Sequence, residues 1–131
     1  MRLTGRVINA GSVTAEAVVL DLPFSFIGDF DPDTGTISIE GHPLFGESIA
    51  HKILVCPTGK GGTIAPFIAY RAWQKGNAPA GILCREAEPL LCESAITINI
   101  PILDSFTQDP VASIKTGQIV SINNNEVTSS D

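Results

Sequence analysis

The stretch ILVCPTGKGGTIAPFIAYRAWQKGNAPAGILC, residues 53–84, decides the fold of this chain. Ile53–Cys56 is continuously apolar, as in a buried strand, and a glycine-rich stretch follows it. Over residues 63–75 the apolar side chains recur with a helical period, and Pro66 suits a first helical turn because its missing N–H bonds nothing there. Residues 80–84 then form a second apolar run. The segment predicts strand, loop, helix and strand, a βαβ unit with parallel pairing.

The residues before this unit indicate strands. Residues 6–20 are rich in β-branched side chains around a glycine, which predicts two short strands or one bulged strand. Residues 31–35, DPDTG, have turn chemistry at every position, and residues 36–39 alternate with period two, as the next strand would.

After the βαβ unit the pattern is weaker. We expect a short helix over residues 88–95, a helical turn or two over 110–116 and a final strand over 118–122. Pro101 interrupts the apolar run of residues 96–103 and favours an edge strand or a bulge there. The fold class predicted is mixed α/β, rich in β-structure, with one prominent βαβ unit.

Composition indicates one ordered domain, residues 1–131, with a flexible tail from about residue 126. Hydrophobic residues make up 44% of the chain and charged residues 17%, fewer than the quarter or so typical of soluble domains. Such an apolar surplus on a small chain suggests that a partner covers part of the surface.

Charge is unevenly distributed along the chain. The net charge is −6, which argues against nucleic acid as a partner, yet residues 51–89 hold five basic and two acidic residues. This positive stretch marks either an anion site or a solvated face.

Cysteine usage favours a cytoplasmic protein with reduced thiols. The three cysteines are odd in number, lack a CxxC pair and have spacings of 28 and 8 residues that match no ferredoxin pattern. The same spacing leads us to expect no metal site in this chain. No secretory segment and no apolar run of membrane-spanning length is present, so we expect no membrane association.

Residues 57–63, PTGKGGT, carry the most chemistry. The segment leaves a strand and opens a helix, where backbone N–H groups and the helix dipole favour an anion. Lys60 adds a positive charge, and Thr58 and Thr63 add hydroxyls. A Walker A loop is excluded because Gly61 follows the lysine in place of Ser or Thr, and GxGxxG fails at Ile64. The segment is either a cradle for a carboxylate or phosphate, or an ordinary glycine-rich turn.

Four stretches together resemble the small subunit, or swivelling domain, of the aconitase X family. They are LPFSFIGDFDPDTGTI at residues 22–37, GHPLFGESIAHKILV at 41–55, ILVCPTGKGGT at 53–63 and FIAYRAWQKGNAPAGILCREAEPLL at 67–91. The corresponding family segments are LSFWGGVDPETG, HPLYGKSIAGKVLV, a GRGST-like loop and a NGTAPAAII stretch. The match runs in the same order from about Ala15 to Asp104.

The resemblance implies an aconitase-like swivelling β/β/α domain that closes over a larger catalytic subunit. Members of the family are hydro-lyases that dehydrate phosphomevalonate or cis-3-hydroxy-L-proline, and their large subunit carries an iron–sulfur or iron centre. This chain would then supply an anion-clamping loop and be active only with its large subunit. The alternative is a non-catalytic structural or regulatory partner of that subunit.

The same resemblance implies the site residues. Lys60 takes the place of the basic residue of the loop, and Gly62 falls on its catalytic serine, so Thr63 and Lys60 become the candidate catalytic residues. Glycine has no hydroxyl with which to transfer a proton. The candidate substrate-binding residues are Thr58, Gly59, Gly61, Gly62, Ser25 and Phe26. The alternative for Ser25 and Phe26 is a place in a phenylalanine core.

Overall fold

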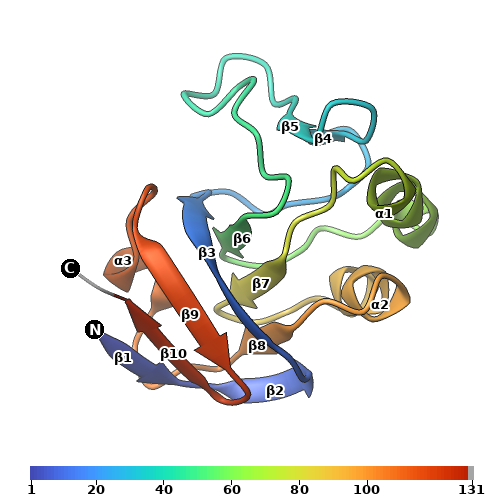
Figure 1. Cartoon of the computed structure of the whole chain (residues 1–131). Coiled ribbons are helices and arrows are strands. Elements are labelled where there is room, and N and C mark those ends of the chain that lie inside the picture. Colours follow the sequence, from blue (N-terminus) through green and yellow to red (C-terminus); the bar gives the residue numbers. More distant parts are fainter. Residues whose placement is uncertain (130–131) are drawn as a thin grey trace.

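The computed structural model describes residues 1–129, and Figure 1 shows how its strands and helices are arranged. In chain order the elements are β1 (Arg2–Thr4), β2 (Arg6–Asn9), β3 (Ser12–Val19), β4 (Phe30–Asp31), β5 (Thr36–Ile37), β6 (Ile53–Cys56), α1 (Ala65–Gln74), β7 (Gly81–Cys84), α2 (Pro89–Thr97), β8 (Ile102–Asp104), α3 (Pro110–Ser113), β9 (Ile119–Asn123) and β10 (Glu126–Ser129).

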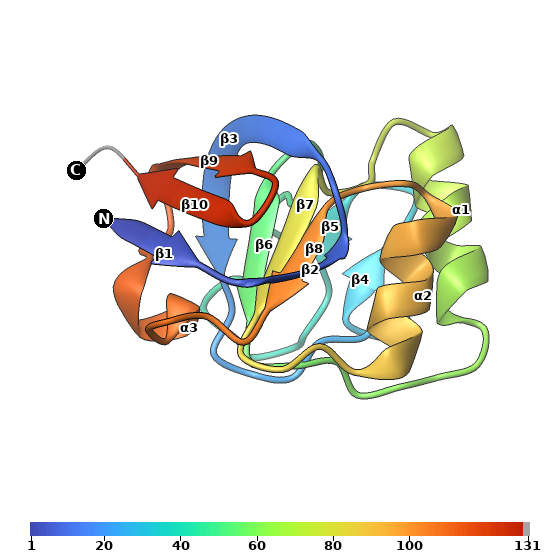
Figure 2. The ribbon, with the colours of Figure 1, turned by 90° about the horizontal axis from the view of Figure 1, so that it is seen from below.

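The elements form three layers, seen edge-on in Figure 2. Strands β1, β10 and β9 make one layer, β3, β6, β7 and β8 make the middle one, and α1 and α2 cover the far face. Strand β3 joins the two strand layers, because Ser12–Glu16 pair antiparallel with β9 and Ala17–Val19 pair parallel with β6. The predicted mixed α/β, strand-rich fold is therefore confirmed.

The middle strands are parallel and buried on both faces. Strand β6 pairs with β7, and β7 with β8, and every residue of these three strands is buried. Along β6 the side chains alternate between two cores: Leu54 faces the helices, while Ile53 and Val55 face the layer of β9 and β10. This two-sided burial explains why the strands are continuous apolar runs in the sequence.

Two βαβ units follow one another, where the sequence analysis predicted one prominent unit. The predicted unit is β6–α1–β7, with α1 beginning two residues after Thr63. The second is β7–α2–β8, whose last strand has only three residues after Pro101. Because the sequence pattern of so short a strand is weak, its parallel pairing with β7 shows only in the structure.

Of the two predictions for the strand after Pro101, an edge strand or a bulge, the edge position is wrong. Strand β8 begins one residue after Pro101 and lies between β7 and β2. Proline is tolerated here because its missing N–H stands outside the strand, while its carbonyl accepts the N–H of Ile82 at 2.9 Å. The irregularity falls on the partner strand instead, where the register shifts between Val7 and Asn9.

The prediction of a flexible tail from about residue 126 is also wrong for Glu126–Ser129. These residues form β10, which pairs with β1 on one side and with β9 on the other. Val127 is fully buried there, so the packing of one apolar side chain favours the strand. Ser130 and Asp131, the rest of that tail, lie outside the described residues.

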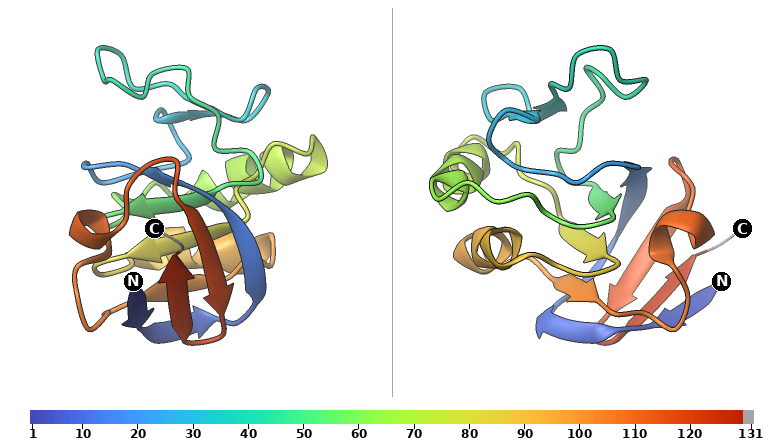
Figure 3. Two further views of the ribbon diagram at one scale, coloured as in Figure 1. Left: turned by 60° about the vertical axis from the view of Figure 1, so that its left-hand side comes forward. Right: turned by 180° about the vertical axis from the view of Figure 1, so that it is seen from behind.

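A long excursion separates β3 from β6 and contains the small β4–β5 hairpin. The DPDTG turn at residues 31–35 closes the hairpin, with the Gly35 N–H donating to the Asp31 carbonyl at 2.7 Å. The predicted strand of residues 36–39 is limited to Thr36–Ile37. Figure 3 shows the excursion standing beyond the end of the middle sheet, on the side where α1 lies.

Asp104, at the end of β8, connects three segments of the chain. Its carboxylate accepts two hydrogen bonds from the Arg6 guanidinium and one from the Ala87 N–H, each at 2.8 Å. Burial by itself would raise the pKa of Asp104, but the hydrogen bonds from Arg6 and Ala87 outweigh it, so the pKa lies below its usual value. The ionised carboxylate is thus the form that the fold stabilises.

We expect Asp104→Asn to lower the free energy of unfolding by about 1.5–3 kcal/mol at neutral pH, since charge-assisted hydrogen bonds are lost. Because the pKa is lower in the folded chain, the carboxylate contributes stability above about pH 4 and loses it as the pH falls through the folded pKa. Urea unfolding at pH 7 and pH 3 should show the two proteins converging at low pH. Glu126→Gln, which removes an exposed partner of Arg2, is the control and should change little.

Candidate functional site

Two segments meet where the neighbouring strands β3 and β6 end. Residues 20–29 leave β3 and residues 57–63 leave β6, which runs parallel to it. The Phe24 N–H donates to the Thr58 carbonyl at 2.9 Å, and the Lys60 N–H donates to the Phe24 carbonyl at 3.2 Å. The predicted glycine-rich loop is therefore held against a second segment, and we call residues 24–29 and 57–63 together the loop site.

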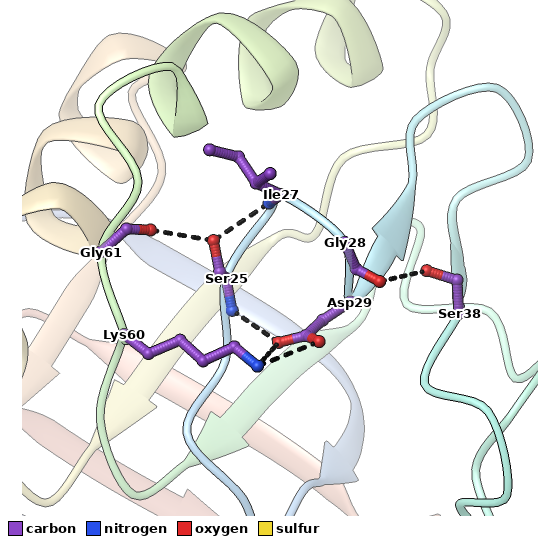
Figure 4. Close-up of polar contacts among 7 residues, drawn as sticks. All are labelled: Ser25, Ile27, Gly28, Asp29, Ser38, Lys60 and Gly61. Carbon is purple, nitrogen blue, oxygen red and sulfur yellow. Dashed lines mark hydrogen bonds and ion pairs between the residues drawn. The ribbon is translucent and has the colours of Figure 1, made fainter.

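The Ser25 side chain connects the two segments, as Figure 4 shows. Its hydroxyl donates to the Gly61 carbonyl at 2.9 Å and accepts from the Ile27 N–H at 3.0 Å. Ser25 is buried, so these bonds are shielded from water. The structure thus brings Ser25 to the loop, where it fixes the backbone at Gly61.

Lys60 and Asp29 form an ion pair beside Ser25. The Lys60 Nζ lies 2.9 Å from one carboxylate oxygen of Asp29 and 3.2 Å from the other (Figure 4). The Asp29 side chain is 10% exposed and that of Lys60 is 51% exposed. The lysine predicted as an anion clamp is therefore exposed at the site with a buried counter-charge against its ammonium.

Four consecutive backbone N–H groups of the loop have no acceptor within residues 1–129. Gly61 and Gly62 have φ of +86° and +97°, a left-handed conformation that favours glycine. None of the N–H groups of residues 61–64 donates to an acceptor within residues 1–129. Consecutive free N–H groups before a helix form a concave site for an anion. In this structure the N–H groups of residues 61–64 are therefore available to a ligand.

Two threonines, Thr58 and Thr63, belong to the loop site. Thr63 is exposed, and its hydroxyl has no hydrogen-bond partner in the described part of the chain. Ile64 is the N-cap of α1 and makes no side-chain cap bond, so Thr63 does not cap the helix. Thr58 is half-buried and its carbonyl is held by Phe24. Of the two, the Thr63 hydroxyl is the more open to a ligand.

Phe26 and Gly59 lie in the interior. Phe26 is 1% exposed and packs edge-on against Phe24 and Phe30, so the structure places it in the aromatic core that was its alternative assignment. Gly59 is buried, and a Cβ there would come within 2.9 Å of the Leu91 Cβ in α2. These two residues therefore lie beneath the surface of the loop site and support it by packing.

Asp29 is the residue of this site that sequence analysis missed. It lies in a cluster with Asp31 and Asp33, three carboxylates separated by one residue each, and nothing in that pattern distinguishes them. Asp33 instead pairs with Arg71 and Lys75 of α1. The chain path through Gly28 decides which carboxylate meets Lys60.

Within residues 1–129, no three His, Cys, Asp or Glu side chains gather as a metal-binding group. The Cys56 and Cys84 sulfurs lie 3.6 Å apart as buried free thiols on neighbouring strands. Contact with Cys56 and burial raise the pKa of the Cys84 thiol well above its usual value, which keeps it protonated and unreactive. No helix in the described part is long and apolar enough to cross a membrane.

Comparison with known proteins identifies the family of this chain and supports its fold. A family model described as the aconitase X swivel domain matches residues 2–129. The chain belongs to this family. The crystal structure of Thermococcus kodakaraensis aconitase X (holo-form) matches it with a TM-score of 0.92 and 35% identity, covering 100% of this chain and 99% of that one. The aconitase X resemblance stated from the sequence is confirmed.

Two relatives in this family are named as enzyme subunits. The phosphomevalonate dehydratase small subunit of Methanosarcina acetivorans is 38% identical over 126 residues, 96% of this chain and 88% of that subunit. The protein of the same name from Pyrococcus horikoshii is 40% identical over 126 residues, 96% of this chain and 92% of that protein. As an aconitase X swivel domain, the chain is a hydro-lyase subunit, and the designation "small subunit" implies a large partner.

We expect a side chain at Gly62 to be costly. A Cβ at Gly62 would lie 2.4 Å from the Ile27 Cδ1, in a backbone with φ of +97°. Gly62→Ala should therefore cost about 1–2 kcal/mol for the left-handed backbone and about 0.5–1.5 kcal/mol more to displace the Ile27 rotamer. Thermal or urea unfolding measures the sum.

Gly117→Ala is the matched control. Gly117 has the same φ of +97° but no atom within 4 Å of the added Cβ. Gly62→Ala should therefore be the more destabilising of the two, and Ile27→Ala should remove the difference. Equal losses for the two glycines would show that the contact with Ile27 carries no energy.

Proposed function

We propose that this chain supplies the substrate-binding loop of a two-subunit dehydratase that acts on a small hydroxy acid. The observation that carries the proposal is the row of four unpartnered N–H groups at residues 61–64, beside Lys60 and before α1. N–H groups at a helix N-terminus and a lysine bind carboxylate or phosphate groups. Every small hydroxy acid presents at least one such group.

The first candidate substrate is phosphomevalonate. Relatives that are 38% and 40% identical over nearly their whole length are named for that substrate. A phosphate also suits the cradle, because its oxygens accept several N–H bonds at once.

The second candidate is cis-3-hydroxy-L-proline, and one contact favours it. The Lys60–Asp29 pair gives the loop site both signs of charge within 3.2 Å. An amino acid also carries both charges, whereas phosphomevalonate carries negative charge alone. Parallel assays with the two substrates distinguish the candidates.

Dehydration of a hydroxy acid requires a base for the acidic proton, an acid for the departing hydroxyl, and an anchor for the carboxylate. In this chain the N–H groups of residues 61–64 and the Lys60 ammonium are the anchor. The Thr63 hydroxyl is exposed next to them and takes the proton-transfer role that Gly62 has no side chain to perform. The acid then has to come from the large subunit.

The described residues of this chain do not fit an iron site, because no three metal-binding side chains gather in them. We therefore place the iron centre on the large subunit, and confine this chain to binding and proton transfer. The three free cysteines are in keeping with a reducing cytoplasm as the location of the enzyme.

We also propose that the large subunit docks on the outer face of α1. Four large apolar side chains lie exposed along this helix and its N-cap, and Tyr70 stacks on Trp73 with ring centroids 5.7 Å apart. They are Ile64, Phe67, Tyr70 and Trp73, with Phe67 74% exposed. This stripe begins at the residue after Thr63, next to the loop site. A single large subunit can therefore cover the loop site and the stripe together. Burial of such side chains drives stable association.

Replacing Phe67 tests this interface. Phe67→Gln should weaken binding of the large subunit by about 1–2 kcal/mol, or roughly five- to thirtyfold in Kd, because an apolar anchor is lost. Titration of the purified subunits measures the Kd. Ile119→Gln is the control, since Ile119 is exposed on β9 in the opposite layer. If both variants bind like the native chain, α1 is not the interface.

The catalytic assignment is tested in the assembled enzyme. Lys60→Ala should lower kcat/KM about tenfold to a hundredfold, since a charge-assisted contact is lost. Lys115→Ala, at an exposed site after α3, is its control. Thr63→Val should lower kcat itself by about a hundredfold or more, as for removal of an acid–base group, and Thr63→Ser should retain activity.

The alternative, a non-catalytic partner of the large subunit, gives a different pattern. In that case Thr63→Val and Lys60→Ala leave turnover unchanged while the subunits still associate. The chain without its large subunit is expected to be inactive, because half of the site is missing. Turnover by this chain alone would contradict the two-subunit proposal.

A further inference from the structure

We propose that Asp29 is a positioning residue that sets the charge of the loop site. Both of its carboxylate oxygens pair with the Lys60 ammonium. The positive charge of the lysine is therefore already balanced by a carboxylate when an anion approaches the loop. The effect on turnover rests on the proposed function, because it assumes a role for Lys60 in the enzyme. The effect of the Asp29 charge on anion binding does not depend on that function.

The ion pair is asymmetric, with a fixed carboxylate and an exposed lysine. The Asp29 Oδ2 accepts the Ser25 N–H at 3.1 Å, and the Asp29 carbonyl accepts the Ser38 N–H at 2.9 Å. The Ser38 hydroxyl also donates to the Gly28 carbonyl at 3.0 Å (Figure 4). The carboxylate is thus bonded to its own segment as well as to Lys60, whose side chain stays half exposed. Asp29 therefore determines where the ammonium lies.

The position of the pair gives it an effect on the cradle. Lys60 directly precedes the four unpartnered N–H groups, and its own N–H is bound to the Phe24 carbonyl. A carboxylate about 3 Å from an ammonium cancels most of its field at longer distance, so an anion approaching the N–H groups meets a dipole rather than a unit charge. Glu88 is the other acid at the loop, with its Oε2 3.7 Å from a Cβ built at Gly61. Together they make the site less attractive to anions in general.

Two opposite consequences follow from removing the Asp29 charge. The isolated chain should bind a simple anion more tightly, because Lys60 is no longer neutralised. The assembled enzyme should turn over more slowly, because Lys60 is no longer held in place. A residue that only supported the fold would weaken both properties, so the opposite signs identify the positioning role.

Inorganic phosphate is the probe for the first consequence. NMR titration of the isolated chain follows the amide signals of residues 61–64 in the native chain and in Asp29→Asn. The variant should bind phosphate about three- to tenfold more tightly, as expected for removing one negative charge close to the site. Adding Lys60→Ala to Asp29→Asn should abolish the gain. Unchanged or weaker binding by Asp29→Asn would overturn the proposal.

Asp33→Asn is the matched control for charge. It removes the same unit of charge and frees two cations, Arg71 and Lys75, but at α1 rather than at the loop. It should leave the phosphate affinity at the loop unchanged, and an equal gain would reduce the effect to net charge and overturn the proposal. If the amide spectrum shows that Asp29→Asn does not fold, Asp29→Ser removes the same charge and must give the same gain.

The second consequence is measured in the assembled enzyme. Asp29→Asn should lower kcat about tenfold with KM unchanged or lower, while Asp33→Asn should change neither. Native turnover by Asp29→Asn would refute the positioning role. If the native assembly dehydrates neither candidate acid, the proposed function fails, and the phosphate titration still decides whether Asp29 sets the charge of the loop.

Discussion

The parallel pairing of β3 with β6 is the constraint on which the site depends. Val19 and Val55 are partners in this pairing, so the segments that leave the two strands start side by side. Phe24 then extends the contact by two backbone bonds, to Thr58 and from Lys60. Without this pairing, the excursion between the strands would have no reason to return Ser25 and Asp29 to a loop more than thirty residues away.

The loop site combines rigid support with a free surface. Below it, Phe24 and Phe26 pack in the aromatic core, and Gly59 lets α2 approach. Above it, the N–H groups of residues 61–64 and the Thr63 hydroxyl have no partner in the described chain. Under the proposed function this surface binds an anion, and the acid that assists the departing hydroxyl comes from the large subunit, as expected of half an active site. The exposed apolar stripe on α1 adjoins this half and supports a second subunit as the source of the rest.

Much of the fold could be predicted from the sequence because local patterns carry it. The apolar run Ile53–Cys56 predicts β6, because a strand that is buried on both faces is apolar throughout. The helical period after Thr63 predicts α1, because only one face of that helix is buried. The turn at residues 31–35 is determined by its proline, aspartates and glycine. Within the site, the order of residues 57–63 indicated either an anion cradle or an ordinary glycine-rich turn, because glycines before a helix can leave N–H groups free.

Tertiary structure alone decided what depends on contacts between distant residues. Local sequence cannot distinguish Asp29 from Asp31 and Asp33, and the chain path brings only Asp29 to Lys60. Whether Phe26 lines a cleft or a core is decided by Phe24 and Phe30. Strand β8 lies inside the sheet because it pairs with β2. Residues 126–129 form a strand, β10, because they pair with β1. Both partners lie at the other end of the chain. Local sequence determines periodicity and turn geometry, because neighbouring residues set both. Ion pairs, strand order and burial are decided by packing, because their partners lie far apart in the sequence.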